Sequence, residues 1–435
     1  MKHFFKNTAT LVLLGGMLSC QEQSHIALVV INPQDSTAHT VVSSMADQLD
    51  TLVTVFNPLY SPYLKDNTTF RVAETHTTDI MGALLSGGKA NVAYVGGFNT
   101  ERGALGERLT ANGITVLSRQ PLVAGRQSMQ YLQNMYRSAA ETKALIYDLV
   151  PARFYEEAVI VKALLTQQEF SGGLIAGSED APAIVMTRHL NFVEWKDGNM
   201  IQRPVWFFDV NRQGDGFSGL APYLDLVNWI TLPEQKLEYA ADVKLLKSRK
   251  WPALLNRYEF ANLTGQQSYP DELKTYINPY NELAVSSNAE IRYLLRGKAV
   301  SVAVDWDYDS EENRGDTFEG ILQAVHFTVE VKSEDRHNII YISPKESADK
   351  QVFEQKLQEI LAKTGIQAVN FEQTAAGKYK ILLPEGNDRN PDKYMASSVR
   401  TFVDYYKKGR VPEWETSFIL AKYQLISDAA KQSAP

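Results

Sequence analysis

The most constraining feature of this sequence is a series of short, continuous apolar runs that recurs through its first third. These runs are IALVVI (26–31), LVTVF (52–56), NVAYV (91–95), ITVL (114–117) and ALIYDLV (144–150). Unbroken apolarity over so few residues is typical of strands buried on both faces, as in a parallel sheet covered by helices. The segments between the runs have helix length, with Ser, Thr or Asn at their starts and glycine at their ends. Residues 24–150 are therefore predicted to form a doubly wound α/β domain.

The pattern changes after residue 150. A helix-like segment at 152–168 is followed by longer runs in which apolar and polar residues alternate, such as KAVSVAVDWDYD (298–309). The turn RGK at 296–298 has the form of a hairpin, and further helices are predicted near 352–364 and 394–408. Alternation indicates an antiparallel sheet with one covered face, so residues 151–435 are predicted to form an α+β domain with a large, mostly antiparallel sheet. A chain of 435 residues has ample length for two domains.

The first 20 residues have the form of an export signal. Lys2 and Lys6 precede the apolar stretch LVLLGGML, which ends at MLSC, and Cys20 is the only cysteine. This pattern resembles a bacterial lipoprotein signal, which implies that residues 1–20 end at a lipidated cysteine. The sequence thus predicts an envelope lipoprotein without a transmembrane span, anchored by lipid alone and facing the periplasm or the cell surface. A plain secretory signal peptide is the alternative.

Charge and spacing argue against two kinds of ligand. The net charge of -7, spread without long like-charge runs, offers no basic surface for nucleic acid. Asp305, Asp307, Asp309 and Asp316 have the spacing of a calcium loop, but Ser310 stands where such a loop requires glycine. We therefore expect a solvated strand face there and no metal site.

The segment SRQP marks a candidate binding edge. Ser118, Arg119 and Gln120 follow the predicted strand 114–117, and Pro121 ends regular pairing. In open α/β sheets, ligands bind at the carboxyl ends of the strands. A guanidinium clamps carboxylates and an amide hydrogen-bonds, but neither transfers protons at neutral pH. The predicted ligand is therefore a small anionic or hydroxyl-rich molecule.

Residues 91–121 resemble the Gfo/Idh/MocA oxidoreductase family, in which a strand, an Asn-x-x-His turn and a helix lead to a strand ending Glu-Lys-Pro. Asn99 matches the asparagine of the turn and Pro121 the final proline. Residues 201–229 resemble the family's substrate loop and helix, while RPVWFFDVNRQGDG, RKWP and GDTFEGI resemble the putative-oxidoreductase C-terminal domain of Bacteroidota. The resemblance implies a Rossmann-like first domain, NAD or NADP as cofactor, a sugar-like substrate, and homo-oligomers formed through the second sheet. It adds three residues to the candidate substrate-binding set, which becomes Arg119, Gln120, Arg203, Asp209 and Arg212.

The sequence departs from that family at its functional positions. The first turn, NPQDSTAH, has none of the glycines that let backbone N–H groups approach a pyrophosphate, and Asn57 replaces the acid that holds the ribose. Arg119 and Gln120 replace the Glu-Lys pair, and Pro222 or Tyr223 falls where the catalytic histidine is expected. The remaining candidate cofactor contacts are Asn32, Asn57, Gly96 and Asn99.

Three functions stay open at this point. The motif losses favour a pseudoenzyme or binding module for a sugar-like molecule, whereas the resemblance favours an active NAD(P)-dependent sugar oxidoreductase with atypical cofactor contacts. The third is an envelope scaffold that assembles through the sheet of the second domain. The sequence leaves open whether the chain is an enzyme.

Overall fold

The structure is a computed structural model. It describes residues 26–31, 37–56, 73–76, 79, 81–82, 90–196, 198–311, 315–334, 337–345, 349–383 and 391–433. The predicted lipidation site Cys20 and the predicted cofactor contacts Asn32 and Asn57 lie outside these residues.

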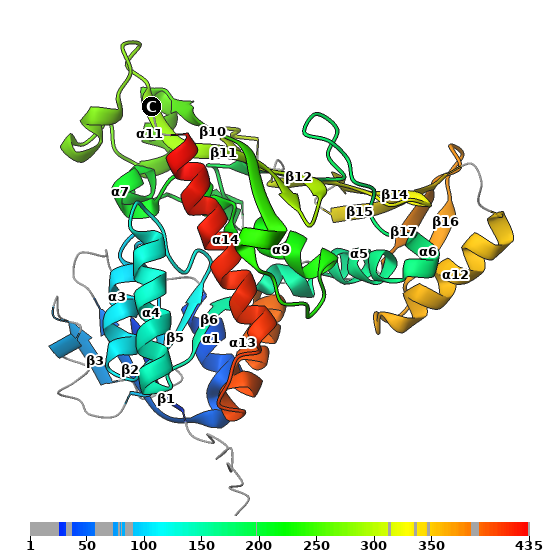
Figure 1. Cartoon of the computed structure of the whole chain (residues 1–435). Helices are drawn as coiled ribbons and strands as arrows, with labels where there is room; N and C mark the ends of the chain where they lie inside the picture. The colour runs from blue at the N-terminus through cyan, green and yellow to red at the C-terminus, as the bar shows by residue number, and fades with distance from the viewer. Residues whose placement is uncertain are drawn as a thin grey trace, which may run out of the picture.

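The first sheet has six parallel strands in the order β3-β2-β1-β4-β5-β6 (Figure 1). Its strands are β1 (Ile26–Ile31), β2 (Leu49–Phe56), β3 (Ala73–His76), β4 (Val92–Val95), β5 (Thr115–Arg119) and β6 (Ile146–Leu149). The strand order reverses at β1, so the crevice between β1 and β4 is the switch point at which doubly wound sheets bind ligands. The predicted Rossmann-like fold class is confirmed.

Helices cover both faces of this sheet. On one face, α3 (Arg102–Ala111) and α4 (Ser128–Thr142) pack on alternate residues of the buried strands. On the other face lie α1 (Ala38–Met45) and α13 (Pro391–Lys407), which contributes Val399 and Phe402 to a core with Leu28 and Val30 of β1. The domain boundary predicted at residue 150 leaves α13 in the second domain, although this helix packs on the first sheet.

The second sheet has nine strands in the order β10-β11-β12-β7-β13-β14-β15-β17-β16. Only the β7–β12 pair is parallel among these neighbours, so the mostly antiparallel sheet is confirmed. Arg296 and Gly297 form the turn between β11 and β12 with φ values of 47° and 76°, as a tight hairpin requires. The strands are β7 (Ile184–Asn191), β10 (Val243–Leu255), β11 (Leu283–Leu295), β12 (Lys298–Asp307), β13 (Thr317–Gln323), β14 (Phe327–Glu334), β15 (His337–Pro344), β16 (Asn370–Gln373) and β17 (Tyr379–Leu382).

One face of the second sheet is covered and the other is open. The covering helices include α5 (Glu156–Thr166), α9 (Ala221–Thr231), α12 (Lys350–Lys363) and α14 (Glu413–Gln432), and α14 also runs down beside the first domain (Figure 1). Along β13, Phe318 and Leu322 face the core, whereas Thr317, Glu319 and Ile321 are exposed. No helix of the described chain is both long and apolar enough to span a membrane.

Shorter elements complete the described structure. The hairpin strands are β8 (Trp195–Lys196) and β9 (Asn199–Met200). The short helices are α6 (Gln168–Ser171), α7 (Val210–Gln213), α8 (Gly216–Gly219), α10 (Tyr239–Asp242) and α11 (Arg257–Thr264), with 3-10 turns η1 (Ala46–Gln48), η2 (Pro151–Phe154), η3 (Val205–Phe208) and η4 (Asp271–Tyr276).

Candidate functional site

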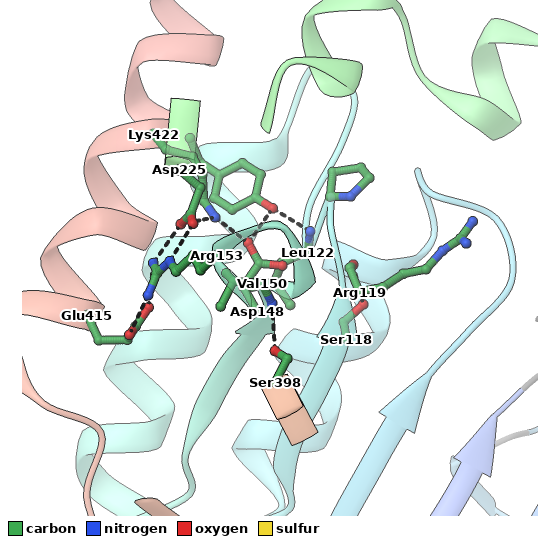
Figure 2. A network of polar contacts seen from close by, with 12 residues as sticks. Ser118, Arg119, Leu122, Asp148, Val150, Arg153, Asp225, Ser398, Glu415 and Lys422 are labelled. Atoms are coloured by element: carbon green, nitrogen blue, oxygen red, sulfur yellow. Dashed lines mark hydrogen bonds and ion pairs between the residues drawn. The ribbon is translucent and has the colours of Figure 1, made fainter. Parts of the chain in front are cut away.

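The carboxyl end of β5 faces the second domain. Ser118 is buried within the strand and donates its hydroxyl to the Val95 carbonyl of β4 at 3.2 Å. Arg119 ends the strand. Gln120 and Pro121 follow it, and the peptide bond between these two residues is cis. Figure 2 shows the Arg119 side chain turned away from the buried polar groups beside β6.

A buried arginine fixes the backbone of this loop through hydrogen bonds. Arg102, only 2% exposed, begins α3. Its Nη1 donates to the carbonyls of Arg119 and Pro121, each at 3.1 Å, and its Nη2 donates to the Gly97 carbonyl at 3.2 Å. One guanidinium therefore ties the end of β4 to the loop after β5. Arg102 was missed in the sequence, although it stands where the Asn-x-x-His turn has its histidine.

Helix α14 also forms a hydrogen bond to this loop. The Leu122 amide donates to the Tyr423 hydroxyl at 2.5 Å, and that hydroxyl donates to Asp148 Oδ2 at 2.9 Å. Lys422 Nζ donates to the same carboxylate oxygen at 2.6 Å (Figure 2). Asp148 belongs to β6 and has no exposed surface. The backbone on both sides of Gln120 is therefore fixed by buried polar groups.

The network continues into the second domain through Arg153. Its guanidinium donates to both carboxylate oxygens of Asp225, at 2.7 and 2.9 Å, and to Glu415 at 2.8 Å (Figure 2). Burial raises the pKa of Asp148 and of Glu415 above the usual range. Burial acts in the same direction on Asp225, but Arg153 and Lys422 outweigh it and hold the Asp225 pKa low. Two cations thus face three carboxylates where the domains meet.

Two cavities adjoin the loop after β5. The first cavity, of about 300 Å³, lies toward the covered face of the second sheet. The second cavity, of about 230 Å³, lies toward η3, α8 and β11. The residues that line both cavities are Arg119, Gln120, Pro222 and Tyr223. These are the positions at which the sequence departs from the family's Glu-Lys pair and catalytic histidine.

Gln120 and Tyr223 each present a hydrogen-bond donor at the wall shared by the two cavities. The Gln120 Nε2 atom is buried, and no described residue accepts a hydrogen bond from it. Tyr223 lies in the first turn of α9 and stacks on Phe318, with ring centroids 6.4 Å apart. Burial raises the pKa of Tyr223 to about 12, so its hydroxyl stays protonated at neutral pH. The shared wall therefore offers hydrogen-bond donors.

Asn99 and Gly96, two of the predicted cofactor contacts, make hydrogen bonds within the protein. Asn99 Nδ2 donates to the Gln213 carbonyl at 2.8 Å, and Asn99 also lines the second cavity. The next residue, Thr100, donates its amide to the Arg212 carbonyl at 3.2 Å. The Gly96 amide donates to the Ile31 carbonyl of β1 at 2.9 Å. The Asn99 turn thus fastens the first domain to the loop that carries α7.

Arg203, Asp209 and Arg212 have partners outside the two cavities. Arg203 Nε donates to the Phe192 carbonyl at 3.0 Å, and its Nη1 lies 3.0 Å from Glu194 Oε2. Asp209 caps α7 by accepting from the Asn211 amide, and it lies 3.5 Å from Arg212. The Arg212 guanidinium sits 5.1 Å from the Phe98 ring centroid. None of the three lines either cavity.

Several described polar groups near this edge are bonded within the protein. Thr37, which precedes α1, shares a hydrogen bond with the Tyr94 hydroxyl. The Nη1 and Nη2 groups of Arg102 donate to backbone carbonyls. Neither cavity has a lysine or a histidine among its described lining residues. The first turn itself lies outside the described residues.

Two of the four aspartates with calcium-loop spacing pair with side chains of β7. Asp305 Oδ1 lies 2.6 Å from His189 Nδ1, and Asp316 Oδ2 lies 3.1 Å from Arg188 Nη2. Within the part of the chain that the structure describes, no three His, Cys, Asp or Glu side chains form a group able to hold a metal ion.

Comparison with known proteins places the fold. Residues 160–434 match the family model described as "Putative oxidoreductase C terminal domain". The crystal structure of a putative oxidoreductase from Parabacteroides merdae has a TM-score of 0.86 and 23% identity, with 94% of this chain and 98% of that chain covered. No curated protein matches the sequence.

Two more distant structures share the two-domain fold. One is a 3-ketoreductase from Actinomadura kijaniata in complex with NADP and TDP-benzene, with a TM-score of 0.54, 13% identity, and 92% and 96% of the two chains covered. The other is the WlbA dehydrogenase from Bordetella pertussis in complex with NADH and UDP-GlcNAcA, with a TM-score of 0.55, 11% identity, and 95% and 96% covered. Because the family model covers more than half of its length, this chain belongs to the family of proteins with a putative oxidoreductase C-terminal domain.

Proposed function

We propose that this protein binds a small sugar-like or anionic molecule between its two domains and does not transfer hydride. The observation that carries the proposal is the wall shared by the two cavities. It presents Arg119, Gln120 and Tyr223 at the positions where the family resemblance places its reactive groups. All three bind ligands readily, but none is suited to move a proton at neutral pH.

The two carboxylates that line the cavities already have partners. Glu157 lines the first cavity, and its Oε1 accepts from Asn338 Nδ2 at 2.7 Å. Asp215 lines the second cavity and lies 3.6 Å from Lys250 Nζ. Oxidation of an alcohol requires a base positioned at the hydroxyl in addition to the hydride acceptor. The described lining therefore favours a pseudoenzyme or binding module.

The second cavity supports a sugar-like ligand. Aromatic side chains such as Phe207 and Trp306 share its lining with Ser218, Ser287 and Asn99. Apolar walls with a few placed hydroxyl and amide groups are typical of small-molecule sites. The related structures in complex with TDP-benzene and with UDP-GlcNAcA place nucleotide-linked ligands on the same fold.

The amino terminus supports a place in the cell envelope. Because MLSC resembles a lipoprotein signal, we infer a lipid anchor at Cys20 and a protein that faces the periplasm or the cell surface. The export signal has no Arg-Arg pair, so the chain is expected to cross the membrane unfolded and without a bound cofactor. This route agrees with a function that needs no NAD or NADP.

Self-association through the open face of the second sheet is a further part of the proposal, and it rests on the family resemblance. Ile321, on the open face of β13, is 40% exposed. Sedimentation of the purified protein tests whether it forms homo-oligomers.

Titration calorimetry tests the proposed ligand class. The full chain carrying Cys20→Ser, which stays free of lipid, is titrated with NAD, NADH, NADP and NADPH and with sugars and sugar acids. We expect no low-micromolar cofactor binding, and at least one sugar or sugar acid whose binding weakens in Arg119→Ala. The control Arg126→Ala changes an exposed arginine of the next loop, which lines neither cavity. Low-micromolar cofactor binding, or steady turnover of any hit, would overturn the proposal.

A further inference from the structure

The first cavity differs in chemistry from the second. Aliphatic and aromatic side chains dominate its walls, including Val161, Met186, Leu226, Ile230, Phe318 and Leu322. These come from α5, α9 and the covered face of the second sheet. A polyol would have to place hydroxyl groups against these walls without partners, which is costly. The first cavity is therefore unsuited to a sugar ring alone.

Two buried donors in this cavity lack acceptors. The Nε2 atom of Gln120 and the Nε atom of Arg188 are both inaccessible to solvent, and no described residue accepts a hydrogen bond from either. Both residues line the first cavity, Gln120 from the end of β5 and Arg188 from β7. Buried donors in proteins almost always have partners, so each unsatisfied donor calls for an explanation. A ligand with acceptor oxygens in the cavity would satisfy both donors once the two side chains turn toward it.

Arg188 is positioned to keep its charge at the cavity. Its Nη2 pairs with Asp316 Oδ2 at 3.1 Å, and Asp316 Oδ1 accepts from the Asn191 amide at 3.1 Å. The Arg188 side chain is 18% exposed, whereas that of Asp316 is 39% exposed. The carboxylate therefore lies nearer to solvent and holds the guanidinium by one end. A guanidinium stays protonated in proteins, so this donor also supplies positive charge.

Glu157 limits how much negative charge the ligand carries. Its carboxylate lines the same cavity and accepts from Asn338 Nδ2, so negative charge is already present on that wall. A second anionic group on the ligand would be repelled there. The cavity volume of about 300 Å³ is at the small end for ligand sites. The complementary ligand is a compact monoanion.

We propose that the first cavity binds an apolar monocarboxylic acid, whose carboxylate accepts hydrogen bonds from Arg188 and Gln120 and whose hydrocarbon part packs against Met186 and Phe318. This inference rests on the proposed binding function of the cleft. It narrows the ligand from a sugar-like or anionic molecule to an acid, or an acid-bearing group, with an apolar body. Apolar burial supplies affinity, and the two donors set the orientation.

Calorimetry with octanoate and octanol tests the inference. We expect the full chain carrying Cys20→Ser to bind octanoate about tenfold or more tightly than octanol, since a hydrogen bond to a charged group has about that effect. The variant Arg188→Met keeps a long apolar side chain and should remove this preference. Gln120→Leu should weaken octanoate binding several-fold.

The control Arg126→Met makes the matched substitution at an exposed arginine that lines neither cavity. It should bind octanoate within about twofold of the parent protein. Equal affinity for octanoate and octanol, or octanoate affinity unchanged in Arg188→Met, would overturn the inference. The octanoate–octanol comparison keeps its meaning even where Arg188→Met fails to fold. Cofactor turnover and sugar binding are measured separately, so the proposed function and this inference can fail independently.

Discussion

The Lys422 ammonium lies 2.6 Å from an Asp148 carboxylate oxygen, and neither side chain has any exposed surface. Asp148 is part of β6, whereas Lys422 is on the last helix, 274 residues further along the chain. The adjacent Tyr423 bonds both Asp148 and the Leu122 amide. The carboxyl-terminal helix therefore fixes the loop after β5, so the binding edge depends on residues that line neither cavity.

Lys422→Met should destabilise the protein strongly. It leaves Asp148 and Asp225 buried without the ammonium, and breaking a buried pair in this way costs about 3–5 kcal/mol. Urea unfolding measures the effect. In the control Lys431→Met, on the same helix, the side chain is 72% exposed and its pairing with Asp428 contributes under about 1 kcal/mol. A similar loss in both variants would show that the buried network does not stabilise the fold.

Tyr423→Phe should loosen the loop after β5. The ring remains, but the buried Leu122 amide loses its acceptor, which costs about 1–3 kcal/mol. Hydrogen exchange at Leu122 should therefore accelerate relative to the strands of the first sheet. Tyr258→Phe, at a side chain 73% exposed, is the control and should leave this exchange rate unchanged. Unaltered exchange in Tyr423→Phe would contradict the assigned role.

Tyr223 should remain a neutral phenol across the physiological pH range. Its pKa is raised to about 12 by burial, whereas an unfolded tyrosine titrates near 10. The folded state therefore retains the proton longer, so this contribution to stability is complete below about pH 10 and is lost as the pH rises through about 12. An ultraviolet difference titration of the parent protein against Tyr223→Phe measures this pKa. A tyrosinate signal near pH 7 would revive Tyr223 as a general base.

The strands of the first sheet were predictable because their signal is local. The run IALVVI coincides with β1 (Ile26–Ile31), and ITVL overlaps β5 (Thr115–Arg119). The packing of α13 on that sheet was not predictable, since a helical pattern does not specify which of two sheets it covers. The sequence also predicted no separate helix for α14, which joins both domains.

Only the part of the candidate site that lies at the end of a strand could be predicted from the sequence. Arg119 and Gln120 line the cavities because the carboxyl edge of a parallel sheet presents its loops to ligands. Arg102 and Arg188 were missed because a charged residue in an amphipathic pattern reads as solvent-facing. Their burial depends on partners distant in the sequence, such as Asp316 for Arg188.

Cys20 is predicted to carry the lipid that anchors the protein. It lies outside the described residues, so the prediction rests on the sequence MLSC. Labelling cells with a radioactive fatty acid should mark the parent protein and leave Cys20→Ser unmarked, and the variant should fractionate away from membranes. Equal labelling, or a parent protein that is released as soluble chain, would favour the plain secretory signal instead.

Restoring the family pair, Arg119→Glu with Gln120→Lys, should not create dehydrogenase activity. The new lysine would stand at the shared wall of the two cavities, but Pro222 and Tyr223 would still occupy the histidine position. The first turn would still lack the glycines that bring backbone amides to a pyrophosphate. If the cofactor does not bind, the new lysine cannot assist a hydride transfer. Cofactor reduction with sugars and sugar acids should therefore stay at the background rate.

The same double variant should also lose affinity for the ligand, and this loss can be measured even if no activity appears. Replacing the guanidinium by a carboxylate removes a charge-assisted hydrogen bond worth about 1.5–3 kcal/mol and adds repulsion toward an anionic ligand. The single variant Arg119→Ala separates these effects, since it removes the donor without adding charge. Affinity that falls in the order parent, Arg119→Ala, double variant would identify the edge of β5 as the contact surface for an anion. Cofactor reduction by the double variant would instead show that the described cleft retains a working dinucleotide site, and that the two substitutions alone had silenced an enzyme.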